Sequence, residues 1–489
     1  MNRERWWLAL AVALPRLLVF PFAQSLFGDA VVRSELAAHW AAAPYLMTSF
    51  AKGPLQFGPL HLMLVGAASW LWPSPEHVGR LVSLVCGVAT VWPLHALTRR
   101  LFPSLPNAPR AACLAFALWG MHIQFSTTAA SEALGVLCVV AAVAALARAL
   151  GEPDVRALVG AAVLLTLACA TRYDAWLLVP LFVVGIAASL PDSRRWTWAV
   201  AFGALASLFP VAWMVGNWVD LGDPLYPAHY IDDFHRAWFP KDEAAWPPGR
   251  YRLMNLVFWP GTAALTLSPL LAVAGFVGLW SAWRTRRDLR WLVAAIALPT
   301  LYFTVRSTLL GNFAPLARFT SKELALLLPF IALGAQVLRP PRAALVAAWA
   351  LAVAFPLALG AITFRRDGGW ADMLRPVSPV STQPVAVTEV AQQLKAQVLP
   401  DDGVVLDADE QGYRDLSVAF LSGLPESRLA RARWKDFDRK LGEVKPRWLV
   451  RFDRVALGAD GARGGVRVRG QEYEELPGTH PPLHLYRAR

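Results

Sequence analysis

The feature that most constrains this chain is a series of long apolar stretches between Trp6 and Thr363, separated by short loops rich in arginine. A helix needs about 20 apolar residues to cross the hydrocarbon layer of a bilayer. Only 17% of the residues are charged and 56% are hydrophobic, whereas a soluble domain carries about 25% charged residues. The sequence therefore predicts a polytopic α-helical membrane protein.

The excess of basic residues supports the same interpretation. The formal net charge is +12, but the arginines cluster in the loops between apolar stretches. Such clusters mark the cytoplasmic side of a membrane protein, and tryptophan, of which the chain has 22, favours the headgroup level. We therefore expect no nucleic-acid partner. All four cysteines fall in apolar stretches with no CxxC pair, so we expect buried, unpaired thiols and neither a disulfide framework nor a metal site.

Charge placement gives a topology. Arg3 and Arg5 precede the first apolar run, which predicts a cytoplasmic N-terminus, and Met1–Gln24 has the pattern of a retained signal-anchor helix. The short run Phe57–Trp72 is bounded by prolines and is predicted to be an interfacial helix. If this interfacial helix lies on the outer side, about eleven spans cross the membrane in alternating directions. The arginine-rich loops are then cytoplasmic and the C-terminus is exterior. We expect a multi-pass protein of the cell (inner) membrane.

The composition changes at Arg365, where charged residues become frequent and apolar runs shorten to strand length. This predicts a transmembrane catalytic domain over residues 1–364 and a small extracytoplasmic (periplasmic) α/β domain over residues 365–489. The expected elements of the second domain are a helix over Thr388–Leu399, strands over Val404–Leu406, Trp448–Phe452 and Leu483–Tyr486, and a hairpin around residues 464–468.

The polar segment after the first span carries two candidate functional residues, Asp29 and Lys52. Ionisable groups at the edge of the apolar layer are costly and mark functional sites. Asp29 is interpreted either as the N-cap of a helix over Ala30–Ala41 or as a general base, and the two roles are compatible. Lys52 is interpreted either as a snorkelling interfacial lysine or as a ligand of a lipid phosphate.

Other polar groups are predicted on the same outer side. Ser131–Glu132 is either a helix cap or part of a site, and Thr171–Asp174 is either a turn with an interfacial Arg–Asp pair or part of a site. Arg306, Arg318 and Lys322 are basic on a side where the positive-inside rule disfavours them, so they call for an anionic partner such as phosphate.

Several classes of site are not indicated by the sequence. The histidines of the apolar part lack HExxH-type spacing, which gives no metal motif. His229, Asp232, Asp233 and His235 are close in sequence and either bind a cation or polar acceptor or lie in a solvated loop. Neither GxGxxG nor GxxxxGK[ST] occurs, so a known phosphate loop for a nucleotide sugar or ATP is excluded.

A set of short motifs in order over residues 1–340 resembles the GT-C superfamily of polytopic glycosyltransferases, in the branch of protein O-mannosyltransferases and of the aminoarabinose transferase that modifies lipid A. The motifs are Gly28–Asp29, Lys52–Leu55, Arg80 with Leu81 and Ser83, Ser131–Leu134, Thr171–Tyr173, Gly222–Leu225 and Arg318–Phe319.

The resemblance implies an inverting transferase that takes a sugar from a polyprenyl-phosphate donor on the exterior face. Asp29 would be the catalytic base, and Lys52, Arg172 and Arg318 would hold the donor phosphate. Glu132, Tyr173, Asp174 and Lys322 would bind substrate. The chain departs from the family in that Ala30 follows Asp29 and Ala51 precedes Lys52, where some members carry a further acid. These departures leave metal dependence open: a divalent metal is compatible with the family but no motif indicates one, so we assign none and no other cofactor.

Two other functions fit many spans and outer-face cations. A transporter or flippase of lipid-linked sugars is one, although paired halves with matching Gly/Pro-broken spans, which indicate a transporter, are not found. A non-catalytic assembly scaffold is the other, and it predicts that Asp29 can be replaced. For the transferase, the expected partners are the lipid-linked donor, membrane lipids and a lipid, polysaccharide or protein acceptor.

Overall fold

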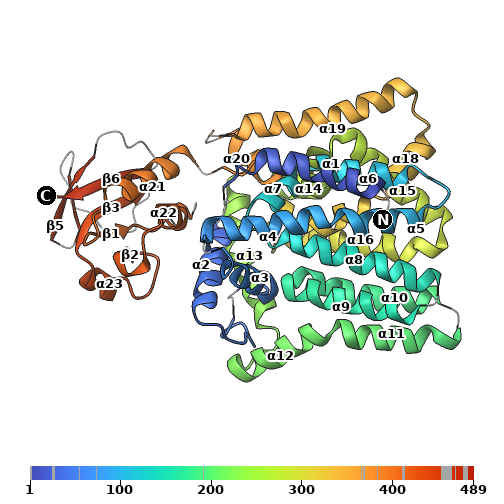
Figure 1. Cartoon of the computed structure of the whole chain (residues 1–489), viewed down its shortest axis with the longest axis horizontal. Helices are drawn as coiled ribbons and strands as arrows, with labels where there is room; N and C mark the ends of the chain where they lie inside the picture. Colours follow the sequence, from blue (N-terminus) through green and yellow to red (C-terminus); the bar gives the residue numbers. More distant parts are fainter. Residues whose placement is uncertain are drawn as a thin grey trace. The chain divides into compact units, whose positions relative to one another are not determined.

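The computed structural model of the chain describes residues 3–24, 28–53, 56–72, 74–152, 154–190, 192–364, 366, 369–382, 384–409, 413–452, 465–468, 470–476 and 483–489. The chain forms two compact units (Figure 1). The helical unit comprises Met1–Ala23, Leu36–Thr363 and Trp370–Val380. The C-terminal unit comprises Gln24–Glu35, Phe364–Gly369 and Ser381–Arg489. One helix, α2 (Gly28–Ala42), begins in the C-terminal unit and ends in the helical unit.

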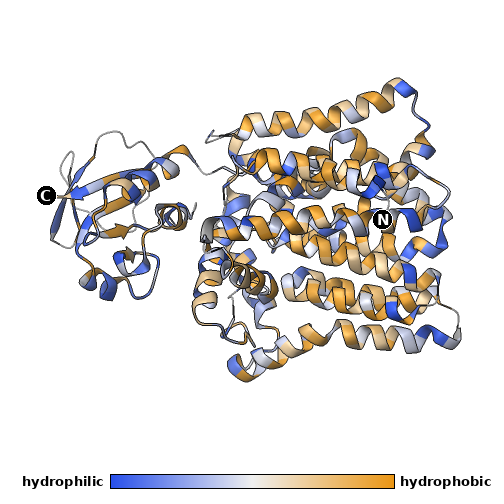
Figure 2. Cartoon of the chain, in the orientation of Figure 1, coloured by the Kyte–Doolittle hydropathy of each residue, from blue (hydrophilic) through white to orange (hydrophobic). Residues whose placement is uncertain are grey.

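The helical unit is a bundle whose helices are apolar along most of their length and polar near their ends (Figure 2). This pattern is expected where the middle part of each helix faces lipid or a neighbouring helix. Its helices are α1 (Arg3–Val19), α3 (Pro59–Ser69), α4 (Pro75–Ala89), α5 (Val91–Leu101), α6 (Ala108–Leu118), α7 (Gly120–Thr127), α8 (Glu132–Gly151), α9 (Val155–Thr171), α10 (Leu178–Ser189), α11 (Asp192–Ala206), α12 (Leu208–Leu221), α13 (Tyr226–Ala244), α14 (Arg250–Leu267), α15 (Pro269–Thr285), α16 (Arg290–Val305), α17 (Ser321–Leu327), α18 (Phe330–Leu338), α19 (Arg342–Thr363) and α20 (Trp370–Leu374).

The prediction of a polytopic helical protein is confirmed, whereas the count of eleven spans is not. In the described part of the chain, four helical segments are long and apolar enough to cross a membrane, or up to six if each of two bent pairs is one span. Four shorter apolar helices accompany them. The sequence showed only continuous apolar runs, and several of these runs are broken in the structure. For example, Trp119 adopts an extended conformation between α6 and α7.

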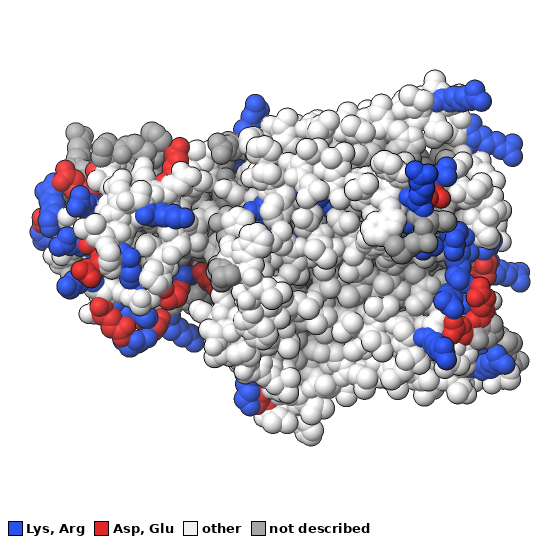
Figure 3. Space-filling model, viewed as in Figure 1, with Lys and Arg blue, Asp and Glu red and all other residues white. Residues whose placement is uncertain are grey.

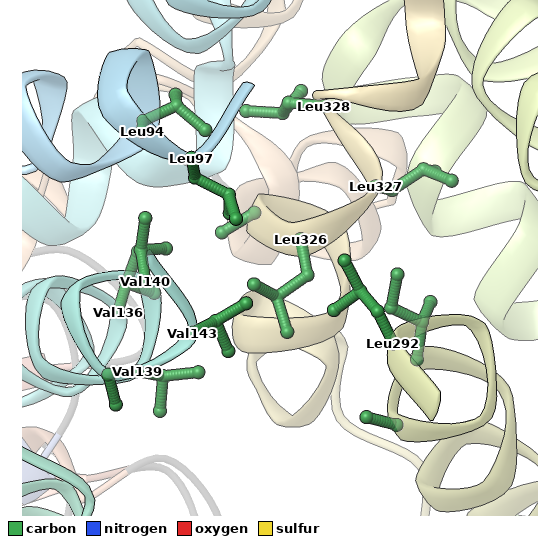
Figure 4. Close-up of a cluster of buried hydrophobic side chains, with 14 of the residues drawn as sticks. Leu94, Leu97, Val136, Val139, Val140, Val143, Leu292, Leu326, Leu327 and Leu328 are labelled. Atoms are coloured by element: carbon green, nitrogen blue, oxygen red, sulfur yellow. The ribbon is translucent and has the colours of Figure 1, made fainter. Parts of the chain in front are cut away.

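The core of the helical unit is built from small and branched aliphatic side chains. Leu94 and Leu97 of α5, Val136 to Val143 of α8, Leu292 of α16 and Leu326 to Leu328 meet in one buried cluster (Figure 4). The four cysteines are buried and unpaired, as predicted. Dispersion contacts between closely packed helices hold such a bundle together in lipid, where the hydrophobic effect adds little.

Helices α15 and α18 approach each other closely at two glycines. A Cβ atom on Gly334 would lie 1.7 Å from the carbonyl oxygen of Ala274, and one on Gly278 would lie 2.0 Å from that of Phe330. Both obstacles are backbone atoms, which cannot rotate away. The two helices therefore need glycine at both positions to keep this distance.

We expect Gly334→Ala to force α15 and α18 apart and to lower the melting temperature of the purified protein in detergent. The expected cost is about 1–3 kcal/mol, typical of overpacking a close contact. Gly160→Ala is the matched control, because nothing lies within 4 Å of a Cβ built there in α9. Alanine favours helix over glycine, so the control should melt at the same or a higher temperature. Equal melting temperatures of Gly334→Ala and Gly160→Ala would contradict the close packing of α15 and α18.

Helix ends that charge placement predicts to lie on one side of the membrane contact one another. Arg110 at the start of α6 donates to Glu4 of α1 at 2.7 Å, and Arg100 of α5 donates to Glu152, just beyond α8, at 3.0 Å. Arg286, just after α15, donates to the carbonyl oxygen of Leu101 at 3.3 Å. Lys and Arg side chains gather at one end of the helical unit, and uncharged residues cover a broad band of its visible face (Figure 3).

The C-terminal unit is a six-stranded sheet in the order β2-β1-β3-β6-β5-β4 with helices on both faces. The first three strands of this order are parallel and the others are antiparallel. Alternate residues of β1 enter two cores, because Val404 and Leu406 pack under α21 and α22 while Val405 packs toward α23. The elements are α21 (Val385–Gln397), β1 (Gly403–Leu406), α22 (Arg414–Ser422), β2 (Leu429–Arg431), α23 (Phe437–Glu443), β3 (Pro446–Phe452), β4 (Gly465–Val468), β5 (Gln471–Glu475) and β6 (Leu483–Ala488).

The small α/β fold predicted for this part is therefore confirmed. The predicted helix corresponds to α21, the three predicted strands to β1, β3 and β6, and the predicted hairpin to β4 and β5. Residue 464 of that hairpin lies outside the described residues. Strand β2 was not predicted, because its three residues, Leu-Ala-Arg, are too few to show an alternating pattern.

Candidate active site

A buried network of ionisable side chains joins three separate segments of the helical unit. Arg172 donates to Glu132 at 2.5 Å and to Asp174 at 3.2 Å, and Lys322 donates to Asp174 at 2.5 Å. Glu323, the next residue of α17, lies within electrostatic range of Lys322, Asp174 and Arg172. We call these five residues the buried charge network. Four of them, Glu132, Arg172, Asp174 and Lys322, were predicted as site residues, and the structure brings these four together.

Local backbone structure explains why these side chains meet. Helix α9 ends at Thr171, Arg172 is extended with φ −149° and ψ 130°, and a 3₁₀ turn follows over Tyr173–Leu177. Glu132 is the first residue of α8, where the helix dipole favours a carboxylate. A Cβ on Gly135, one turn into α8, would lie 3.1 Å from Cδ of Arg172, so a glycine leaves room for the arginine stem.

The network is both buried and acidic overall. The side chains of Glu132, Arg172, Asp174 and Lys322 are 2%, 9%, 10% and 1% exposed. Three carboxylates face two cations, so one formal negative charge is in excess. Within the described part of the chain, Oε2 of Glu323 has no hydrogen-bond partner. The turn and the Arg172–Asp174 pair expected at Thr171–Asp174 are present, but the pair is buried and also bonds Glu132 and Lys322 from two further segments.

Lys52 lies in a second group of polar contacts. Its Nζ donates to Oδ1 of Asp220 at 2.6 Å, and the Ser49 hydroxyl donates to Oδ2 of the same carboxylate at 2.6 Å. The amide of Phe50 donates to the side-chain oxygen of Asn217 at 2.7 Å. These bonds fix the first polar segment on the end of α12. The Lys52 side chain remains 65% exposed and accessible to a ligand. Pro54 and Leu55 of its motif lie outside the described residues.

Arg306 belongs to a third group, with a protein carboxylate as its partner. It donates to Asp232 of α13 at 2.9 Å and to the Asn312 side-chain oxygen at 3.1 Å. The anionic partner expected for Arg306 is therefore supplied by a carboxylate of the protein itself. The solvated-loop interpretation of residues 229–235 is wrong, because they form part of helix α13 and His235 is buried against Phe313. The sequence alone did not distinguish the two cases, because a polar loop and a polar helix that covers an aromatic cluster have similar amino-acid compositions.

His235 and Asp223 are among the titratable groups around α13 whose pKa values are shifted. Burial, with a smaller contribution from the nearby Arg306, lowers the pKa of His235 to about 4, although Asp232 opposes the shift. A hydrogen bond from His229 at 2.7 Å lowers the pKa of Asp223. His235 is therefore neutral at pH 7 and packs as an aromatic ring.

The low pKa of His235 predicts an acid-sensitive fold. The unfolded chain takes up this proton near pH 6.5 and the folded chain only near pH 4, so stability is full above pH 6.5 and falls between these values. The difference corresponds to about 3 kcal/mol. His235→Phe should flatten the dependence of melting temperature on pH between 7 and 4.5, while His77→Gln, at an exposed position, should leave it unchanged. An unaltered pH profile in His235→Phe would contradict this assignment.

The remaining predicted residues are Asp29, Arg318 and Tyr173. Asp29 is the second residue of α2 and lies in its first turn, so it is inside the helix and is not the N-cap of a helix that begins at Ala30. Arg318 lies in a 3₁₀ turn over Ala317–Thr320, with its guanidinium 5.8 Å from the ring centre of Phe319. The Tyr173 hydroxyl donates to the carbonyl oxygen of Phe57 at 3.2 Å, just before α3.

Sequence reasoning missed three polar residues that the structure makes central. Asp220 holds Lys52, Glu323 joins the buried charge network, and Arg16 of α1 is fully buried, donating to Ser126 at 3.1 Å and to the carbonyl oxygen of Phe116. Each lies within or at the end of an apolar run. The rule that ionisable residues in such runs are functional or paired would have identified all three.

No group of three or more His, Cys, Asp or Glu side chains suited to a metal ion occurs in the described ranges. The three carboxylates of the buried charge network are bonded to, or lie beside, two cations, which is not a metal-ligand set.

One family model matches part of the chain. The family model for dolichyl-phosphate-mannose-protein mannosyltransferase matches residues 52–214, which include Lys52, Glu132, Arg172 and Asp174. No curated protein sequence matches the chain.

Solved structures show the same fold at low sequence identity. ArnT from Cupriavidus metallidurans bound to undecaprenyl phosphate has a TM-score of 0.62 and 13% identity, over 99% of this chain and 98% of that chain. The Archaeoglobus fulgidus oligosaccharyltransferase in complex with Zn and sulfate has a TM-score of 0.54 and 14% identity, over 92% of this chain and 67% of that one. The resemblance drawn from the motifs agrees with both findings: the mannosyltransferase family model matches residues 52–214, and the chain has the fold of these solved structures.

Proposed function

We propose that the protein is a membrane glycosyltransferase that moves a sugar from a polyprenyl-phosphate-linked donor to an acceptor on the exterior face of the cell membrane. The observation that carries the proposal is the buried charge network, which gathers Glu132, Arg172, Asp174 and Lys322 from three segments of a GT-C fold. Three of these residues lie in the part matched by the mannosyltransferase model. A purely structural bundle gains little from so many buried charges, which are costly in a membrane.

In the proposed reaction the acceptor attacks the anomeric carbon from the side opposite the phosphate. The bond between that carbon and the phosphate oxygen breaks, its electron pair leaves with the polyprenyl phosphate, and the configuration inverts. Asp29 takes the proton of the acceptor hydroxyl or amine. Cations near the leaving phosphate stabilise the charge that develops on it, which is commonly the largest contribution to such catalysis.

The three cations assigned to the donor phosphate differ in their contacts and exposure, and these differences indicate different roles. Lys52 has a single carboxylate partner and a mostly exposed side chain, so it can add a phosphate to its contacts. Arg318 lies in a short turn directly before α17 and is partly exposed. Arg172 is almost completely buried and bonded to two carboxylates. We therefore propose that Lys52 and Arg318 contact the phosphate, and that Arg172 and Lys322 orient Glu132 and Asp174 toward the sugar.

The test is turnover by purified protein in bilayers with a panel of polyprenyl-phosphate hexoses and pentoses, supplied with an extracted envelope fraction as the source of acceptor. The readout is release of free polyprenyl phosphate from each donor. Turnover of one donor above the level of protein-free bilayers supports the proposal and identifies the sugar. Movement of an intact donor across the bilayer, without cleavage, would support a flippase and reject the transferase.

A further inference from the structure

The segment that carries Asp29 is bonded at both ends to the rest of the C-terminal unit. At its start, the amide of Gln24 donates to the carbonyl oxygen of Ser381 at 2.6 Å, and the Ser381 hydroxyl donates back to the carbonyl oxygen of Gln24 at 2.6 Å. This reciprocal pair ties two chain positions that are 357 residues apart. The segment Gln24–Glu35 therefore packs as a part of the C-terminal unit although it belongs to the first polar loop of the sequence.

The other end is held by an ion pair. Arg431, the last residue of β2, donates from Nη2 to Oε1 of Glu35 at 3.1 Å and also pairs with Glu426. The Arg431 side chain is only 5% exposed and that of Glu35 is 21% exposed. Within the described residues, the Nε and Nη1 atoms of Arg431 have no hydrogen-bond partner. The contacts of its guanidinium are therefore concentrated on these two carboxylates.

The position of Arg431 follows from the sheet. β2 lies parallel to β1, and Arg431 is in register with Leu406, the last residue of β1. The residues of β2 are buried and its backbone is hydrogen-bonded to β1, so the main chain at Arg431 is held in a fixed position. Glu35 in turn lies in the same helix as Asp29, six residues later. Six residues of α-helix rise about 9 Å, so a rotation or shift of α2 at Glu35 is transmitted directly to Asp29.

We propose that Arg431 is a positioning residue for Asp29: the C-terminal unit holds the first turns of α2 through Arg431–Glu35 and Ser381–Gln24, and so sets the place and orientation of the catalytic carboxylate. The inference rests on the proposed function, in which Asp29 is the base. It gives the C-terminal unit a part in the reaction that does not depend on acceptor binding. A general base must stay within hydrogen-bond reach of the acceptor, and a displacement of 1 Å can lower a rate by about 10²-fold.

The test compares Arg431→Gln and Glu35→Gln with the wild-type full-length protein in bilayers, using the donor that the wild type turns over. Both variants should lower kcat by about tenfold or more, while KM for the donor stays within about twofold, because the misplaced group acts on the acceptor proton. Arg431→Lys, which keeps the charge, should recover a measurable part of kcat. Hydrogen exchange at the amides of residues 28–35 should be faster in Arg431→Gln than in the wild type.

Arg439→Gln is the matched control. Arg439 lies in α23 of the same unit and forms exposed pairs with Asp436 and Glu443, and such pairs contribute little to stability. It should leave kcat, KM and the exchange of residues 28–35 unchanged. A control that lowers kcat as much as Arg431→Gln would show a general effect of surface charge and overturn the proposal.

The outcomes separate this inference from the proposed function. If Asp29→Asn is inactive while folded Arg431→Gln and Glu35→Gln both keep full kcat, the transferase stands and the positioning role is wrong. If Asp29→Asn keeps full activity, Asp29 is not the base, so the proposed mechanism is wrong and the positioning role that rests on it is wrong as well. If Arg431→Gln loses activity through loss of folding, its melting curve shows this, and Glu35→Gln, at a more exposed position, then decides the question.

Discussion

Asp29→Asn is expected to lower kcat for sugar transfer by about 10²–10⁴-fold, the usual effect of removing a general base. The amide of asparagine keeps the size and hydrogen-bonding shape of the carboxylate but cannot accept the acceptor proton. Asp29 lies in the first turn of α2, where the helix dipole favours an acid, so the substitution also removes a small stabilising interaction of about 0.3–1 kcal/mol. That loss is too small to unfold the protein.

The measurement is kcat and KM for the donor and acceptor in bilayers, beside the melting temperature of each protein. Asp233→Asn serves as the control, because Asp233 is exposed on α13 and its contact with Arg236 is long, at 3.9 Å. The control should behave as the wild type. Activity of a folded Asp29→Asn within a few-fold of the wild type would remove Asp29 from the mechanism.

Lys322→Met is expected to destabilise the helical unit by about 3–5 kcal/mol, because it leaves three buried carboxylates with Arg172 as the one remaining cation of the network. Lys322 is 1% exposed and bonds Asp174 at 2.5 Å, and Glu323 follows it in the same helix. Methionine has a similar length and apolar stem, so the loss of charge dominates the change. The variant should also lose transfer activity, since Asp174 keeps only its bonds from Arg172 and is held less firmly in place.

A second substitution separates charge from packing in this prediction. Lys322→Met combined with Glu323→Gln removes one cation and one anion, and should melt at a higher temperature than Lys322→Met alone. Lys241→Met, at an exposed position of α13, is the control and should change stability by no more than about 0.5 kcal/mol. A melting temperature of Lys322→Met equal to that of the wild type would show that the buried charge network contributes nothing to the fold.

The features that are local in sequence were predicted well. Apolar runs bounded by arginines indicated the helical unit, and the contacts of Arg110 with Glu4 and of Arg100 with Glu152 join loops that charge placement assigned to one side. In the C-terminal unit, helical spacing indicated α21 and alternation indicated the β4–β5 hairpin. These patterns act over a few residues, which is the range that a single sequence shows directly.

The parts that were missed depend on contacts between distant residues. Glu132 and Arg172 are 40 residues apart, and Lys322 is 148 residues from Asp174, so no local spacing predicts that they pair. The sequence did place them on one predicted side, which is why they could be named as candidates. Helix breaks such as Trp119 were missed because an apolar run looks the same whether it is one helix or two.

The most direct test of the central claim uses sealed vesicles that contain the purified protein, a polyprenyl-phosphate sugar labelled in both its sugar and its lipid, and the extracted envelope fraction as acceptor. The fate of the two labels is followed by mass spectrometry. The account predicts one free polyprenyl phosphate for each sugar found on an acceptor, with the anomeric configuration inverted. Recovery of both labels in one uncleaved donor that has changed leaflet would contradict it.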